Sequence, residues 1–174
     1  MFEDLSLLAL IPARSGSKGL PNKNTLQCAG KPLIEWSISA AQKVNYIDDV
    51  LVTTDSEEIA SISMNAGASI PFLRPAFLAE DDSSMLDVIK HAWDNHLSKS
   101  GQHYDYVVLL QPTSPLRTSN HIKEAIDFYF TNCKSGADTL SSVYPVSQKH
   151  GWLMEATNNS EYIKFCMDVS LKNP

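Results

Sequence analysis

A loop of small residues and cations follows an apolar run close to the start of the chain. Residues 12–24 read PARSGSKGLPNKN, so Arg14, Lys18 and Lys23 are interspersed with alanine, serine and glycine. Small side chains let backbone N–H groups approach a ligand closely, and the cations supply positive charge for a polyphosphate. The spacing matches neither G-x-x-x-x-G-K-[ST] nor G-x-G-x-x-G. We therefore predict a phosphate-binding loop of another kind; the alternative is a solvated surface loop with scattered charges.

Two more polar loops follow later apolar stretches, and their groups suit other parts of a nucleotide or a sugar. They span 74–84 and 111–117, and they carry Arg74, Ser83, Ser84, Gln111, Thr113, Ser114 and Arg117. Arginine binds oxyanions in a bidentate way, whereas amides and hydroxyls bind neutral groups such as a base edge or a sugar hydroxyl. If all three loops lie at the carboxyl edge of one sheet, they form one site. The alternative for Arg117 is a surface ion pair with a carboxylate.

Several other polar residues favour structural roles. Asp55 is expected to cap the helix that follows it, and Ser83 or Ser84 is expected to cap the next helix. The acidic run 80–82 is expected to be a solvated loop rather than a metal site. The five histidines are dispersed and lack the i, i+4 pairing of a helical metal site. No metal ligand is assigned within the chain.

Short apolar stretches alternate with amphipathic helical stretches along most of the chain. The candidate strands lie at 6–11, 49–54, 69–73, 104–110 and 138–143. This alternation predicts an α/β fold of three layers, α/β/α, around a mostly parallel, doubly wound sheet. We assign residues 1–143 to a nucleotide-binding α/β domain. Residues 144–174, where the pattern changes, are assigned to an excursion or arm of the same domain.

Composition narrows the class of protein. The chain has 174 residues, which fits one domain, and its net charge of −6 argues against nucleic acid or an anionic membrane as a partner. No segment approaches the ~18 apolar residues of a membrane span. The three cysteines are far apart, which argues against a disulfide framework or a zinc site and fits a reducing cytoplasm.

Four segments in the same order resemble one family. Residues 11–24 closely resemble the signature of the N-acylneuraminate cytidylyltransferases, also called CMP-sialic acid synthetases. The segments 53–55, 73–79 and 109–117 resemble further segments of that family, so the match is collinear over most of residues 7–143. The resemblance implies the fold of nucleotide-diphospho-sugar transferases. It also implies transfer of CMP from CTP to a nonulosonic (sialic-type) acid, with Mg²⁺ and release of pyrophosphate.

The resemblance assigns roles to matching residues. Arg14 and Lys23 are expected to be catalytic, because their counterparts hold the triphosphate and neutralise the departing pyrophosphate. The expected nucleotide-binding residues are Arg14, Ser15, Gly16, Lys23, Asn24, Arg74, Ser83 and Ser84. The sugar acid is expected to lie against Gln111, Thr113 and Ser114.

One feature of the family is missing from these residues. Its Mg²⁺-binding aspartates lie in a later segment, so we expect no metal ligand here and expect the chain to be truncated at its C-terminus. The longer protein is expected to be a cytoplasmic homodimer, with 144–174 at the start of the dimerisation arm. Two alternatives stay open: a non-catalytic module that binds CTP or sugar, or a cytidylyltransferase for legionaminate, pseudaminate or 3-deoxy-manno-octulosonate.

Overall fold

The chain divides into two compact units, residues 1–138 and 139–174. A computed structural model describes residues 5–132, 139–143, 154–156 and 163–165. Most of the first unit is therefore described, and it contains all three of the polar loops singled out above.

A parallel sheet of three strands forms the centre of the first unit. The strands are β1 (Leu7–Pro12), β4 (Asp49–Thr53) and β5 (Tyr106–Leu109), in the order β4-β1-β5. Leu10 of β1 pairs with Leu51 on one side and Leu109 on the other. All six residues of β1 are buried, which explains their nearly unbroken apolar character. The stretch expected to be extended at 69–73 contributes one parallel bridge, from Ser69 to Leu51.

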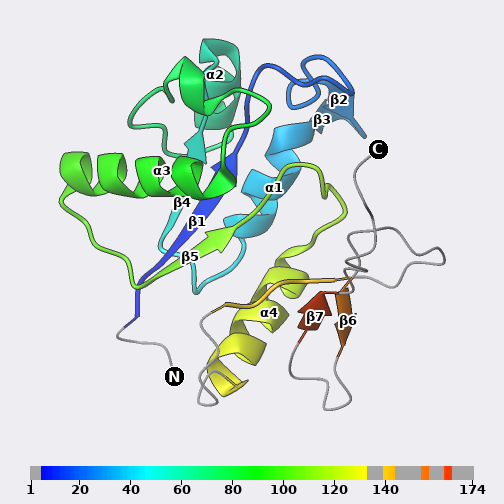
Figure 1. Cartoon of the computed structure of the whole chain (residues 1–174), viewed down its shortest axis with the longest axis vertical. Coiled ribbons are helices and arrows are strands. Elements are labelled where there is room, and N and C mark those ends of the chain that lie inside the picture. The colour runs from blue at the N-terminus through cyan, green and yellow to red at the C-terminus, as the bar shows by residue number, and fades with distance from the viewer. Residues whose placement is uncertain (1–4, 133–138, 144–153, 157–162, 166–174) are drawn as a thin grey trace, which may run out of the picture. The chain divides into compact units, whose positions relative to one another are not determined.

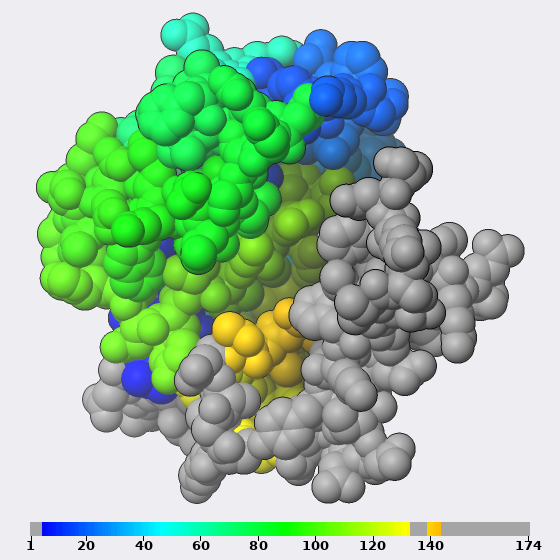
Figure 2. Space-filling view, in the orientation of Figure 1, coloured from blue at the N-terminus to red at the C-terminus, as the bar shows by residue number. Residues whose placement is uncertain are grey.

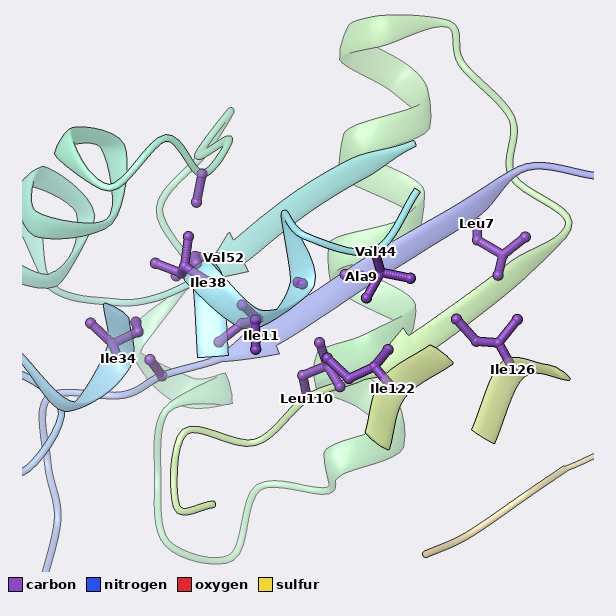
Figure 3. Close-up of a cluster of buried hydrophobic side chains, with 14 of the residues drawn as sticks. Leu7, Ala9, Ile11, Ile34, Ile38, Val44, Val52, Leu110, Ile122 and Ile126 are labelled. Carbon is purple, nitrogen blue, oxygen red and sulfur yellow. The ribbon is translucent and has the colours of Figure 1, made fainter. Parts of the chain in front are cut away.

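Helices cover both faces of this sheet (Figure 1). Leu7, Ala9 and Ile11 of β1 pack in one buried cluster with residues of α1 (Leu33–Ala41), α2 (Glu57–Asn65) and α4 (Ser119–Asn132). Figure 3 shows these three side chains beside those from α1 and α4. Leu8 and Leu10 point to the other face and pack against α3 (Met85–Ser100). The predicted α/β fold, with a parallel sheet between helices, is confirmed.

A tight hairpin precedes α1. Its strands β2 (Gln27–Cys28) and β3 (Lys31–Pro32) are antiparallel. The two residues of the turn have positive φ angles, 49° for Ala29 and 91° for Gly30, as a primed hairpin turn requires. The Trp36 indole donates to the Cys28 carbonyl at 2.8 Å and so joins the hairpin to the first turns of α1. This contact therefore holds the hairpin, which follows the first polar loop, against the start of α1.

The described parts of the second unit are small. Strands β6 (Met154–Ala156) and β7 (Ile163–Phe165) form an antiparallel pair. The strand predicted for 138–143 is wrong in its described part, because residues 139–143 are exposed and form no regular structure. The prediction used only the apolar residues within this segment, whereas a strand also needs a neighbouring strand with which to pair. Asp138 and most of the predicted arm at 144–174 lie outside the described residues.

A 3-10 turn, η1 (Ala76–Leu78), is the remaining element of the described part of the first unit, and it lies within the second polar loop. Among the residues that the structure describes, no helix has both the length and the apolar character needed to cross a membrane.

Candidate functional site

The first two polar loops meet beside the carboxyl ends of β1 and β4. Ala13, directly after β1, donates its N–H to the Thr53 carbonyl at 3.0 Å. Arg74 donates its backbone N–H to the Thr54 carbonyl at 2.7 Å. Figure 2 shows the blue atoms of the first loop next to the green atoms of the second in the upper part of the view. Ligands of open α/β sheets bind at this edge.

An open pocket of about 740 Å³ lies between these loops. One wall comes from the first loop and the other from the second, with the lining residues Arg14, Gly16, Ser17, Lys18, Ala79, Glu80, Asp81 and Asp82. Both of the residue kinds predicted for phosphate binding, small residues and cations, therefore face the same space. The opposite wall is acidic, which the sequence did not predict.

The cations of the first loop bind a carboxylate of the second. Arg14 forms a very short ion pair with Asp81, and Lys18 Nζ lies 2.7 Å from the other Asp81 oxygen. Arg14 also donates to the Ala79 carbonyl at 3.2 Å. Hydrogen bonds from Lys18 and Arg14 hold the pKa of Asp81 below its ordinary value. The loop therefore has the geometry to bind an oxyanion, since it already binds one from its own chain.

Asp55 binds the first loop and does not cap α2, which corrects the expectation. Its two oxygens accept the Ser15 N–H at 2.9 Å and the Ser15 hydroxyl at 2.5 Å. The cap of α2 is Ser56, whose side chain accepts the Ile59 N–H. Asp55 and Ser56 both fit the capping pattern. Because Asp55 is bound by Ser15 of the first loop, Ser56 caps the helix. Sequence reasoning missed this role of Asp55; the signals were a carboxylate two residues after a strand and its place in the segment 53–55 that resembles the family.

Arg74 is buried next to Asp55. Only 5% of the residue is exposed, and its Nη2 lies 3.9 Å from an Asp55 oxygen. Within the described residues its Nε and Nη2 have no hydrogen-bond partner. Burial lowers the pKa of the Arg74 guanidinium, the Asp55 charge opposes this, and Arg14 lowers it further. A buried guanidinium with unsatisfied donors is a candidate for binding an acceptor group of a ligand.

The remaining residues predicted in the first loop have different surroundings. Asn24 is buried, and its side-chain amide donates to the Arg14 carbonyl at 3.1 Å. Lys23 is half-buried and does not line the pocket. In the described part of the chain its ammonium has no ion-pair partner. Asn24 thus supports the loop, while Lys23 keeps its charge available.

Ser83 and Ser84 line a second open pocket, of about 610 Å³, which shares Glu80 and Asp82 with the first. Ser83 donates its hydroxyl to the Phe77 carbonyl at 3.0 Å. Ser84 is the residue before α3, but its side chain makes no capping hydrogen bond. The expectation that one of these serines caps α3 through its side chain is therefore wrong, because Ser83 is bound elsewhere and Ser84 stays exposed.

The third loop lines neither pocket. Gln111, Thr113 and Ser114 are exposed after β5. Arg117 donates its guanidinium to the Gln111 carbonyl at 3.3 Å and its N–H to the Ser114 carbonyl at 3.1 Å. Arg117 therefore closes its own loop instead of pairing with a carboxylate. The structure brings together Arg14, Ser15, Gly16, Asn24 and Arg74. The third loop leaves the same carboxyl edge, since β5 runs parallel to β1 and the Leu110 N–H donates to the Leu10 carbonyl at 2.9 Å, but the predicted sugar-acid residues line neither pocket.

A comparison with protein families decides the class of this chain. The family model described as "Cytidylyltransferase" matches residues 8–160. The chain belongs to the cytidylyltransferase family. Membership agrees with the resemblance of its four segments and with the cations at the carboxyl edge of the sheet.

Two curated cytidylyltransferase relatives show how much of such a protein the chain represents. The CMP-N,N'-diacetyllegionaminic acid synthase of Legionella pneumophila is 41% identical over 163 residues, which is 92% of this chain and 67% of the relative. The N-acylneuraminate cytidylyltransferase of Escherichia coli is 46% identical over 125 residues, which is 72% of this chain and 28% of the relative. The chain spans between about a quarter and two thirds of these relatives.

A solved structure shares the cytidylyltransferase fold. It is a CMP:2-keto-3-deoxy-manno-octonic acid synthetase complexed with CTP, with a TM-score of 0.60 and 23% identity. The match covers 73% of this chain and 48% of that one. At this identity the similarity concerns the fold alone.

Proposed function

We propose that the whole protein transfers CMP from CTP to a nonulosonic acid and releases pyrophosphate. The observation that carries this proposal is the pocket where Arg14, Lys18 and the small residues between them face one space. Family membership supports it, as do relatives named for sialic and legionaminic acids. Both acids carry a carboxylate and an anomeric hydroxyl that can attack a phosphate.

In the proposed reaction the anomeric oxygen attacks the α-phosphorus of CTP. A new P–O bond forms while the bond from the α-phosphorus to the bridging oxygen breaks, so pyrophosphate leaves with that oxygen and the hydroxyl proton is released. Arg14 and Lys23 are proposed to neutralise charge on the triphosphate and on the departing pyrophosphate. As in other phosphoryl transfers, the protein contributes mainly positioning and electrostatic stabilisation.

The other predicted residues are proposed to bind the two substrates. Backbone N–H groups of Gly16 and its neighbours would bind phosphate oxygens, with Asn24 supporting that loop and Asp55 holding the Ser15 N–H. Arg74, Ser83 and Ser84 would bind the cytidine end of CTP. The sugar acid would contact Gln111, Thr113 and Ser114.

Mg²⁺ is proposed as the cofactor of the whole protein, with ligands outside the described residues. The described residues contain no group of three or more histidine, cysteine, aspartate or glutamate side chains that could hold a metal ion. In this part of the chain Asp81 is engaged by cations. The described residues therefore do not fit a metal centre, and no step of the reaction is assigned to the metal.

The same proposal includes a homodimer, a cytoplasmic location and a role in making cell-surface polysaccharide. The location is supported by the three widely spaced cysteines, which fit a reducing compartment. Light scattering after size-exclusion chromatography would test the dimer, and a mass of one chain would contradict it.

A second candidate is a protein that binds CTP without catalysis. It is favoured by one observation, that the described residues keep the cationic loop but contain no metal-binding group. One experiment separates the two candidates. The protein is incubated with Mg²⁺, CTP or UTP, and each of N-acetylneuraminate, legionaminate, pseudaminate and 3-deoxy-manno-octulosonate. We expect pyrophosphate and a CMP-sugar with CTP only; CTP binding without either product would favour the second candidate.

A further inference from the structure

Asp55 binds one candidate loop and lies beside a buried charge of another. Both its oxygens accept hydrogen bonds from Ser15, and one of them lies 3.9 Å from Nη2 of Arg74. Helix α2 does not need Asp55, since Ser56 caps it. The Asp55 carboxylate therefore serves the polar loops at the sheet edge and not the helix that follows it.

Hydrogen bonds hold the backbone both before and after the Arg14 side chain. Before it, the Ala13 N–H donates to the Thr53 carbonyl at 3.0 Å. Asp55 holds the Ser15 N–H and hydroxyl from the end of β4. Asn24 holds the Arg14 carbonyl at 3.1 Å from the far end of the loop. The Asn24 and Asp55 bonds together hold the peptide unit that joins Arg14 to Ser15, so the Arg14 guanidinium and Gly16 are directed toward the pocket that they line.

The charge of Asp55 also balances the charge of Arg74. The Arg74 side chain is 3% exposed, and the Asp55 side chain is 17% exposed. A buried guanidinium without a counter-charge is strongly unfavourable, and Asp55 forms the one ion pair of Arg74 among the described residues. Removing the Asp55 charge would leave Arg74 without this compensation, so the Arg74 side chain would be free to shift.

We propose that Asp55 is a positioning residue for nucleotide binding, which holds the Arg14 loop in place and keeps Arg74 beside it. This inference rests on the proposed function, since it assumes that the loop binds CTP. Asp55 itself touches no substrate in this proposal. It acts through Ser15 and Arg74.

The chain contains a matched control for this role. Asp105 accepts the Ser6 N–H at 2.8 Å and the Ser6 hydroxyl at 3.0 Å, the same two kinds of donor that Ser15 offers to Asp55, here both on one carboxylate oxygen. Ser6 and Asp105 precede β1 and β5, so they lie at the opposite edge of the sheet. Asp55→Asn and Asp105→Asn therefore make the same chemical change, but only the first touches the candidate site.

The test measures the dissociation constant for CTP by calorimetry and the unfolding midpoint of each variant. We expect Asp55→Asn to weaken CTP binding by about tenfold or more, because a hydrogen-bonded charge is lost. Asp105→Asn should change it less than about twofold, although both variants lose stability. Ser15→Ala should weaken binding by about threefold, and its effect should not add to that of Asp55→Asn.

Several results would overturn the positioning role of Asp55. Equal CTP affinity in Asp55→Asn and the parent, or equal losses in Asp55→Asn and Asp105→Asn, would overturn the positioning role while leaving the proposed function intact. A parent protein that binds no CTP would overturn the proposed function and this inference together. If Asp55→Asn does not fold, Ser15→Ala decides alone, because it keeps the carboxylate; unchanged CTP affinity in that variant would overturn the inference.

Discussion

Asp81 holds Lys18 at the candidate site, with 2.7 Å between its carboxylate and the Lys18 ammonium. Its other oxygen pairs with Arg14. Carboxylate and phosphate oxygens accept hydrogen bonds from the same donors of arginine and lysine. Under the proposed function, a triphosphate bound by the same donors would therefore compete with Asp81 for these two cations.

Asp81→Asn is expected to tighten CTP binding by about two- to fivefold, because an exposed ion pair contributes little and only that pair is removed. Calorimetric titration with CTP measures the effect. Asp82→Asn is the matched control, since Asp82 lines the same pocket but forms no ion pair within the described residues. Equal gains in both variants would mean that net charge, and not competition by Asp81, governs binding.

Lys23→Ala is expected to lower turnover sharply while the fold stays intact. Loss of one charge contact to the transition state costs about 2–4 kcal/mol by analogy with oxyanion-hole deletions, or roughly 30- to 1000-fold in rate. Pyrophosphate release measures turnover, and the unfolding midpoint measures stability. Lys43→Ala, at an exposed lysine just beyond α1, is the control and should leave both unchanged. Normal pyrophosphate release from Lys23→Ala would contradict the role of Lys23.

Tyr104→Phe is expected to destabilise the first unit. The buried Tyr104 hydroxyl donates a very short hydrogen bond to Asp49 and lies 3.1 Å from Nε2 of His96. Removing it leaves both partners without that bond, at a cost of about 1–3 kcal/mol in the free energy of unfolding. Urea titration measures the change. Tyr106→Phe is the control, since no hydrogen bond of the Tyr106 hydroxyl is found in the described residues. An equal loss of unfolding free energy in Tyr106→Phe would argue against a stabilising role for the hydrogen bonds of Tyr104.

The buried Tyr104 hydroxyl also predicts that the free energy of unfolding falls at alkaline pH. Burial, together with the hydrogen bond to Asp49 and its charge, raises the pKa of Tyr104 above the ordinary value of about 10. Above about pH 10 the unfolded chain releases this proton while the folded chain retains it, so the free energy of unfolding falls as the pH rises. Below that pH the contribution is complete. The difference in stability between the parent and Tyr104→Phe should therefore shrink as the pH rises above about 10, and a constant difference would contradict the raised pKa.

Strands and helices could be predicted where the pattern of apolar residues within one segment is enough to identify the element. The apolar run expected to be a strand at 6–11 overlaps β1, which spans Leu7–Pro12, and the stripe expected after Thr118 belongs to α4. Burial on both faces of a central strand leaves a continuous apolar run, and burial on one side of a helix leaves a stripe. The strand expected at 138–143 failed in its described part because the run gives no information about a pairing partner.

The sequence by itself determined that a loop of small residues and cations follows the first strand, and that it resembles the signature of one family. Only the tertiary structure decided what that loop contacts. Arg14 meets a carboxylate 67 residues away, and Ser15 meets one 40 residues away. Spacing along the chain describes neighbours within one helix or strand. These two contacts arise instead because β1 and β4 end at the same edge of the sheet, and the second loop lies beside that edge.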